Sequence, residues 1–392
     1  MIISINNAVQ ATYIFIAIFV VAFFLSLRRR TDGEVFSVSL THELKGLAIL
    51  AIMFSHIGYF LVSDHRFLFP LSIMAGVGVN IFLFLSGFGL AVSSMRKDYT
   101  VWQFYKRRIL KLLIPFWIVL VMFFVADFFI LNIGYSWDYI IRSFIGLFPR
   151  ADLATDVNSP LWYFTAILFY YLIFPIIFFK KHPWLSALFL YAVGVVIIQI
   201  EPKYFTEVLR LYQVHTIAFP IGVFVGSMLF SSNKIRSYLF YKFQKIALHI
   251  RQTNLAVKIR HHKKENTVHY KFLNTVIQLG ELMVVVFLLA IALYTAYHSG
   301  VGNLPDLEQF ISLVTMFALL AIFLIKKVDI NLFHIFGFYS YEIYLLHWPI
   351  LSRYDIFLKI MPSWLAVVIY LVFFLALGWL LKKISKNISK FV

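Results

Sequence analysis

The stretch ELKGLAILAIMFSHIGYF, Glu43 to Phe60, places a lysine at the start of an apolar run and a histidine well inside it. The chain of 392 residues is 61% hydrophobic and has a mean hydropathy of +0.85. This is more apolar surface than one soluble core can bury, so we predict an integral membrane protein. An ionisable side chain at membrane depth is costly unless it has a partner or a task. His56 is therefore a candidate functional residue.

Eleven apolar runs are long enough to cross about 30 Å of hydrocarbon at 1.5 Å per residue. Each is expected to be a helix, because helices and closed barrels alone satisfy every backbone polar group in lipid. The fold class is thus predicted to be all-α and polytopic. The predicted spans are approximately 9–27, 44–63, 76–95, 112–133, 161–179, 184–200, 213–230, 275–297, 307–325, 333–352 and 363–381.

The distribution of positive charge predicts the orientation, because cytoplasmic loops retain Lys and Arg. An outside amino terminus places 28 of the 35 basic residues on one side, which we expect to be cytoplasmic, together with the carboxyl terminus. The same bias explains the net charge of +17 without any nucleic-acid partner. We predict location in the plasma membrane. Cysteine is absent, which excludes disulfides and thiolate chemistry.

The first run is interpreted as an anchor helix. No basic residue precedes it and Arg28 to Arg30 follow it, which is the reverse of a cleaved signal peptide. We therefore expect an additional anchor over residues 1–30 and a membrane domain over 31–392. The loop 231–273 holds ten basic residues, with apolar residues at helical spacing, and is predicted to lie on the anionic cytoplasmic leaflet. Substrate binding by this loop is the alternative.

Lys45 and His56 are eleven residues apart, so they lie on roughly the same face of one helix and are expected to line one cavity. A lysine at a helix end often only extends its ammonium group to the membrane–water interface. A lone histidine is as readily a packing residue as a catalyst. Asn80 and Ser86, in the small-residue stretch Gly76–Val92, are predicted to serve helix packing.

The stretch GFYSYEIYLLHWPI, Gly337 to Ile350, carries a second polar group. Ser340, Tyr344 and His347 fall at i, i+4 and i+7, which predicts one stripe facing the bundle or a cavity. Glu342 points elsewhere and requires a basic partner on a neighbouring helix. The alternative is that the stripe only joins helices through hydrogen bonds.

Four cations, Lys106, Arg107, Arg108 and Lys111, crowd the expected cytoplasmic entrance of the span 112–133. Positive-inside bias alone predicts some of this charge. Four cations so close together would also hold a polyphosphate, because Arg and Lys bind phosphate oxygens through charge-assisted hydrogen bonds.

Five stretches in chain order resemble the acyltransferase family 3 membrane enzymes, which are O-acyltransferases of glycans and some small molecules. They are Lys45 with His56, IFLFLSGFGL (81–90), FYKRRILKLLIP (104–115), LWYFTAILFYYLIFP (161–175) and GFYSYEIYLLHWPI (337–350). The resemblance covers residues 43–350. It departs from the family at Lys45, where members usually have Arg, which leaves open which cations contact the donor.

The resemblance implies a ten-helix core, to which the first span is an addition, and acyl-CoA, most often acetyl-CoA, as the donor. Its phosphates would lie near Lys45 and the run Lys106 to Lys111. His56 would be the general base, and Ser340, Tyr344 and His347 would orient it or stabilise the oxyanion. A covalent acyl relay stays open. No metal is expected.

A membrane transporter or flippase for a polar or glycan substrate is the rival interpretation, with His56, Glu342 and His347 relaying protons or binding cargo. The paired, broken helices of many transporters are not visible in the sequence. Loop 134–160 is the candidate for contact with a carbohydrate or other hydroxyl acceptor, through Trp137, Asp138, Arg142, Arg150, Asp152 and Asp156. Acceptor identity, acyl length and oligomeric state stay open.

Overall fold

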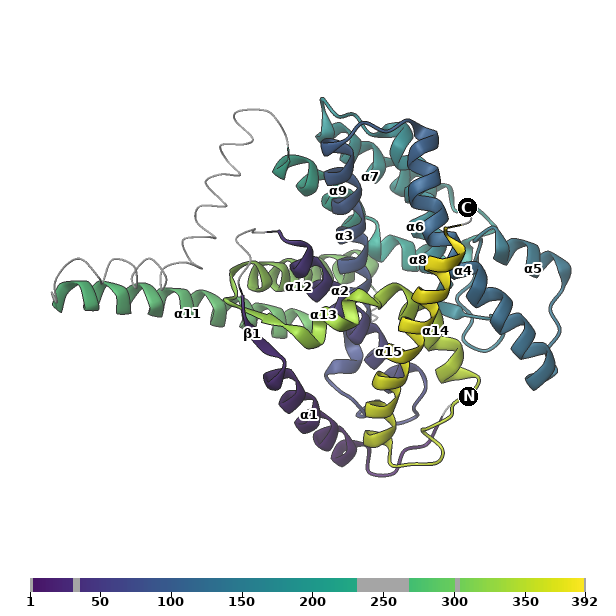
Figure 1. Ribbon diagram of the computed structural model, residues 1–392, viewed down its shortest axis with the longest axis horizontal. Helices are drawn as coiled ribbons and strands as arrows, with labels where there is room; N and C mark the ends of the chain where they lie inside the picture. The colour runs from purple at the N-terminus through teal and green to yellow at the C-terminus, as the bar shows by residue number, and fades with distance from the viewer. Residues whose placement is uncertain (1–2, 31–35, 231–267, 300–303, 391–392) are drawn as a thin grey trace.

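The computed structural model describes residues 3–30, 36–230, 268–299 and 304–390. Within these ranges the chain is helical apart from loops, one two-stranded sheet and one isolated strand bridge, which confirms the predicted all-α polytopic fold (Figure 1). The helices are α1 (Ala8–Leu25), α2 (Val38–Ser55), α3 (Ala75–Arg96), α4 (Val101–Leu131), α5 (Trp137–Phe144), α6 (Trp162–Ile177), α7 (Pro183–Ile200), α8 (Thr206–His215), α9 (Ala218–Leu229), α11 (Val268–Tyr297), α12 (Pro305–Ile325), α13 (Asn331–Phe338), α14 (Ser340–Ser352) and α15 (Ser363–Ile388). The strands are β1 (Leu27–Arg29) and β2 (Val328–Ile330).

Nine helical segments among the described residues are long and apolar enough to cross a membrane. They start at Ala8, Val38, Ala75, Val101, Ser159, Pro183, Thr206, Pro305 and Ser363. The predicted span 333–352 is missing from this set because the chain breaks at Tyr339 into α13 and α14. In α11, the described apolar part is the shorter segment Leu282–Tyr297. Most of the predicted basic loop, residues 231–267, lies outside the described residues.

The first helix is tied to the bundle at both of its ends. Ile3 donates a backbone hydrogen bond to Leu61 before α1 begins. After α1 ends, β1 pairs antiparallel with β2, with Leu27 opposite Ile330. Along its length α1 lies beside α15, and Phe15 packs edge to face on Phe54 of α2 at 5.4 Å. The additional helix is therefore packed onto the other helices.

Two helix crossings depend on glycine, as close helix packing in membranes generally does. A Cβ on Gly337 of α13 would lie 1.6 Å from the His42 carbonyl oxygen of α2, and one on Gly46 would lie 1.8 Å from that of Phe333. A Cβ on Gly87 of α3 would likewise come 2.3 Å from a carbonyl oxygen of α9. Gly89, which the sequence grouped with these residues, has no atom within 4 Å of its Cβ position.

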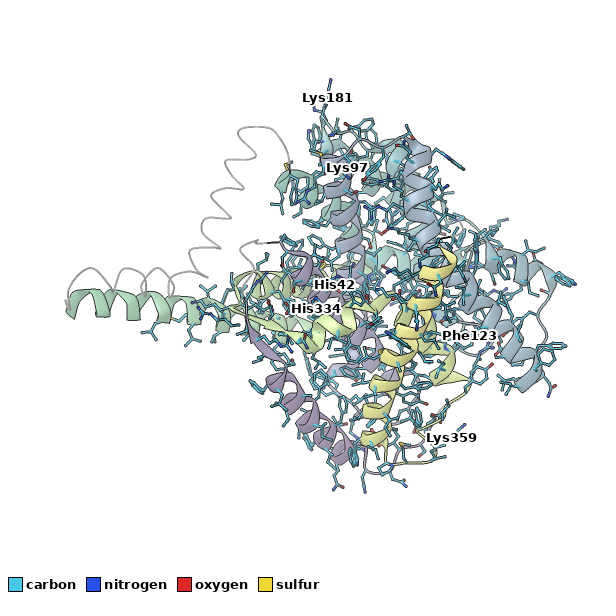
Figure 2. The ribbon with its side chains drawn as sticks, viewed as in Figure 1. His42, Lys97, Phe123, Lys181, His334 and Lys359 are labelled. Carbon is cyan, nitrogen blue, oxygen red and sulfur yellow. The ribbon has the colours of Figure 1, made fainter. Side chains whose placement is uncertain are left out.

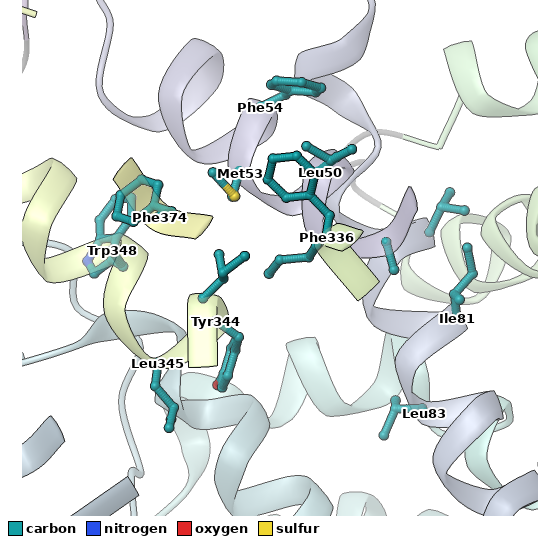
Figure 3. Close-up of a cluster of buried hydrophobic side chains, with 14 of the residues drawn as sticks. Leu50, Met53, Phe54, Ile81, Leu83, Phe336, Tyr344, Leu345, Trp348 and Phe374 are labelled. Atoms are coloured by element: carbon teal, nitrogen blue, oxygen red, sulfur yellow. The ribbon is translucent and has the colours of Figure 1, made fainter. Parts of the chain in front are cut away.

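Apolar side chains from α2, α3, α13, α14 and α15 meet in one core (Figure 3). Leu50 and Met53 of α2 face Phe336 of α13, and Trp348 of α14 lies beside Phe374 of α15. All five side chains are buried. This core fixes α2 against α14, which are the two helices that carry the predicted histidines.

Three lysines that the charge distribution assigns to different sides of the membrane lie at different ends of the molecule. Lys97 and Lys181, predicted to be cytoplasmic, are at the top of the view in Figure 2, and Lys359, predicted to be outside, is at the bottom. We refer to these ends as the predicted cytoplasmic end and the predicted outer end. The chain is an integral, multi-pass membrane protein.

Candidate active site

His56 stands at a change in helix type. The α-helical hydrogen bonding of α2 ends at Ser55, and His56–Phe60 form a single π-helical turn. A π turn widens the helix, and such turns are frequent at functional sites. The His56 ring is enclosed by aromatic rings, with the Trp348 ring 5.0 Å and the Phe60 ring 5.7 Å away, both at steep angles. The ring is thereby held in one orientation.

His56 and His347 form a direct hydrogen bond. The Nδ1 atom of His56 lies 2.6 Å from Nε2 of His347. The ring planes differ by only 4° and the ring centroids are 4.9 Å apart, so the hydrogen bond runs close to the plane of both rings. His347 itself is completely buried. The second histidine of the predicted stripe therefore lies against the first, although 291 residues separate them.

The surroundings of His347 assign the protons in this pair. Its Nδ1 lies 2.9 Å from the Tyr344 carbonyl oxygen and 3.1 Å from that of Ile343. Carbonyl oxygens only accept, so His347 carries its proton on Nδ1 and its Nε2 is an acceptor. His56 must then donate from Nδ1, which leaves its own Nε2 with a free lone pair. This is the protonation state that a general base requires.

A cavity of about 380 Å³ adjoins His56. Its wall comes from α2, α3, α6, α8 and α14 and from the loop before α6, and it includes His56, Tyr344 and Trp348. Loop residues of the predicted outer end, among them Ala151 and Leu153, also line it. Lys45 is not among its lining residues. The cavity therefore joins His56 to the predicted outer end, and the expectation that Lys45 shares this cavity is wrong.

The other members of the stripe on α14 have separate partners. Tyr344 lines the cavity, and its hydroxyl donates to the Pro160 carbonyl oxygen at 2.6 Å. The Ser340 hydroxyl donates to the Gly337 carbonyl oxygen at 3.0 Å, within the turn that joins α13 to α14. Neither hydroxyl bonds to His56. In this arrangement only His347 of the stripe touches the candidate base.

Lys45 belongs to a cluster of charges nearer the predicted cytoplasmic end. It interacts electrostatically with Arg108 of α4, Lys382 of α15 and Glu342 of α14. Glu342, which is buried, interacts with both lysines. Two basic groups on neighbouring helices, α2 and α15, are therefore close enough to Glu342 to stabilise its charge. The three cations are half-buried and Glu342 is the one carboxylate among them, so the cluster of Lys45, Arg108, Lys382 and Glu342 has an excess of positive charge.

The basic run on α4 divides into two sides. Lys106, Arg107 and Lys111 are exposed, and Arg107 lies over the Tyr99 ring at 5.3 Å. Arg108 alone of the four points toward Lys45. Lys382 was not among the residues that the sequence analysis singled out. Its participation could not be found from spacing, because α15 follows Lys45 by more than 300 residues.

A file of polar side chains lies between the cation cluster and the cavity. Tyr171 interacts electrostatically with Arg108, and the Ser86 hydroxyl faces the hydroxyls of both Tyr171 and Tyr163. Tyr163 lines the cavity and its ring lies 5.5 Å from that of Tyr344. These residues are half-buried inside the bundle. Ser86, predicted to serve packing, therefore lies on a polar path between the two sites.

Asn80 connects two buried groups that the sequence did not bring together. Its Nδ2 donates to the Ser312 hydroxyl at 2.8 Å, and its Oδ1 lies 2.8 Å from Nδ1 of His215. His215 also lines the cavity. Sequence analysis missed it, because one histidine in a short polar segment before an apolar run carries no distinctive spacing.

The loop 134–160 covers the cavity at the predicted outer end. Asn158 donates to the Leu345 carbonyl oxygen at 2.9 Å, which joins the loop to α14. Buried Asp127 of α4 pairs with Arg353, whose guanidinium also donates to the Asp156 carbonyl oxygen. Burial raises the pKa of the Asp156 carboxyl.

The charged residues proposed from this loop contact the protein itself. Arg142 pairs with Asp138, Arg150 lies 3.4 Å from Glu207, and Asp156 accepts from the Asp152 backbone at 2.9 Å. Trp137 is exposed. The loop reaches the cavity instead through Ala151, Leu153, Ser159 and Pro160. Its contact with an acceptor stays a prediction.

Comparison with known proteins gives one match. A family model described as an acyltransferase domain, that of acyltransferase family 3, matches residues 44–383. No curated protein and no solved structure matches the chain significantly. The matched range contains both histidines and the four residues of the cation cluster. Among the described residues, no group of three or more His, Cys, Asp or Glu is arranged to hold a metal ion.

Proposed function

Because the chain belongs to acyltransferase family 3, we propose that this membrane acyltransferase moves an acyl group, acetyl in the simplest case, from acyl-CoA to a hydroxyl of a glycan or lipid-linked sugar. The observation that carries the proposal is the hydrogen bond from His56 to His347, which leaves the His56 Nε2 lone pair beside a cavity. Family membership favours an enzyme over a transporter.

The chemistry that we propose uses His56 as the base. The acceptor hydroxyl gives its proton to Nε2 of His56 while its oxygen forms a bond to the thioester carbonyl carbon. When the carbon–sulfur bond breaks, the CoA sulfur takes that proton from the imidazolium. The resulting products are an ester and CoA thiol. His347 accepts from Nδ1 throughout, so it holds the ring and stabilises the charge on His56.

The donor is proposed to enter from the predicted cytoplasmic end. CoA carries phosphates, and Lys45, Arg108 and Lys382 form a half-buried group whose positive charge exceeds the single negative charge of Glu342. Lys45 lies about 16 Å along α2 from His56. The polar file of Tyr171, Ser86 and Tyr163 spans this interval and supports a route for the amide-bearing pantetheine arm.

The acceptor is proposed to enter from the opposite end, where loop 134–160 borders the cavity. Donor and acceptor would then meet at His56 without either crossing the whole membrane. This layout requires the plasma membrane orientation that the positive charges predict, with the cation cluster on the cytoplasmic side.

The test is acyl transfer by the purified protein in proteoliposomes that contain mixed membrane glycans. With acetyl-CoA labelled in the acetyl group, we expect label in glycan or in free acetate. Donor should be used only when added on the side of the cation cluster, which a protease-accessible tag on the carboxyl terminus identifies. Absence of CoA release with acetyl-CoA and with longer acyl-CoA donors would contradict the proposal.

A further inference from the structure

His215 is a second histidine on the wall of the same cavity, contributed by the end of α8. It is only 6% exposed. Its ring lies nearly parallel to that of Trp162, with ring planes 17° apart and centroids at 5.7 Å. The mechanism proposed above makes no use of it, so its place in the cavity requires another explanation.

The orientation of the Asn80 amide indicates the tautomer of His215. In the structure the amide donates from Nδ2 to the Ser312 hydroxyl and turns its Oδ1 toward His215. An amide oxygen only accepts, so His215 carries its proton on Nδ1. Its Nε2 is then a hydrogen-bond acceptor, for which no hydrogen bond to the described residues is found. The three residues come from α8, α3 and α12, so this chain of hydrogen bonds links three helices.

The Cε1 edge of the His215 ring lies against a wall residue of the cavity. Asn80 and Gly76 are one turn apart on α3, and the ring runs along this face with Nδ1 at Asn80. Its Cε1 lies 3.7 Å from the position that a Cβ of Gly76 would occupy. Gly76 is itself a wall residue of the cavity, and without a side chain it leaves this edge of the ring uncovered. Nε2 is the next atom around the ring.

We propose that His215 is an acceptor-positioning residue, whose Nε2 accepts a hydrogen bond from a hydroxyl of the acceptor other than the hydroxyl that His56 deprotonates. This inference rests on the proposed function. An acceptor held in this way must carry at least two hydroxyl groups in a fixed relation, as a sugar ring does and a simple alcohol does not. The two histidines thus have different tasks, one in proton transfer and one in orientation.

The experiment measures CoA release from acetyl-CoA by the full-length protein in detergent as methyl glycosides are added. The probes are the methyl glycosides of glucose, galactose, mannose and N-acetylglucosamine, with cyclohexanol as the single-hydroxyl control. For wild type we expect at least one glycoside to change the rate in a saturable manner and cyclohexanol to leave it unchanged. His215→Ala should raise the half-saturating glycoside concentration roughly three- to tenfold, the loss of one uncharged hydrogen bond, with a smaller change in the limiting rate.

Two milder variants keep the proposal testable if His215→Ala does not fold. Ser312→Ala removes the hydroxyl that orients Asn80 and should raise the half-saturating concentration in the same direction. Thr315→Val on the same helix also removes a buried hydroxyl, which bonds to Thr295 at 2.7 Å, and should leave it unchanged. The contrast between these variants separates acceptor positioning from a general loosening of α12.

The outcomes distinguish this inference from the function on which it rests. Equal glycoside dependence in wild type, His215→Ala and Ser312→Ala would overturn the role of His215, as would equal responses to cyclohexanol and the glycosides. A wild-type rate that none of the four glycosides changes would also overturn the role of His215. A wild-type protein that releases no CoA from any acyl-CoA would instead contradict the proposed function.

Discussion

Replacing His347 by alanine removes the acceptor for the Nδ1 proton of His56 while the candidate base stays in place. The structure shows one short hydrogen bond between the rings, at 2.6 Å, with His347 completely buried. When His56 takes up the acceptor proton, this bond becomes a hydrogen bond to a charged group, which is worth about 1.5–3 kcal/mol. At about 1.4 kcal/mol for each tenfold change in rate, His347→Ala should lower the turnover rate by roughly 10- to 150-fold.

The assay is a double-mutant cycle on acyl-CoA turnover, with the Km for the donor measured in parallel. His56→Ala should lower turnover by about 10²- to 10⁴-fold, the contribution of a general base. The double variant should be no slower than His56→Ala, because His347 acts only through His56. His347→Gln, whose amide oxygen can accept from His56, should recover part of the rate. Full activity in His347→Ala, or losses that multiply in the double variant, would refute this reasoning.

Three further predictions test other parts of the account. Lys45→Ala should raise the Km for acyl-CoA whereas Lys45→Arg should be tolerated; an unchanged donor Km in Lys45→Ala would place the phosphates elsewhere. Gly337→Ala should lower the free energy of unfolding by at least about 3 kcal/mol, because its Cβ would meet the backbone of α2, whereas Gly89→Ala should have little effect; thermal unfolding in detergent compares the two. Asp127→Asn breaks the buried pair with Arg353 and should cost about 3–5 kcal/mol by the same measurement; an unshifted unfolding temperature would show that the pair does not hold the loop.

The sequence predicted the helices well because lipid leaves few alternatives for an apolar chain. Each of the eleven apolar runs is mainly helical where the structure describes it. The break at Tyr339 was not predicted, because no Gly or Pro stands at that position and hydropathy stays high across it. The length of α4 was also underestimated. Its first turns are basic and begin at a capping box formed by Thr100 and Gln103.

The sequence identified several residues of the candidate site but did not predict which of them contact one another. His56 and His347 were singled out because ionisable groups are costly at depth, but their direct contact depends on how α2 crosses α14. Lys382 and His215 were missed, since they join the cluster and the cavity through helices distant in the chain. Periodicity identifies the face of a helix, whereas the partner of that face is decided by packing.

The central claim is that His56 is the base for acyl transfer, and the most direct test compares two histidine variants in proteoliposomes with labelled acetyl-CoA and membrane glycans. His56→Ala should transfer label about 10²- to 10⁴-fold more slowly than wild type. His65→Ala should transfer label at the wild-type rate, because His65 is an exposed residue of the loop after α2 and does not line the cavity. Label transfer by His56→Ala at the wild-type rate would contradict the account.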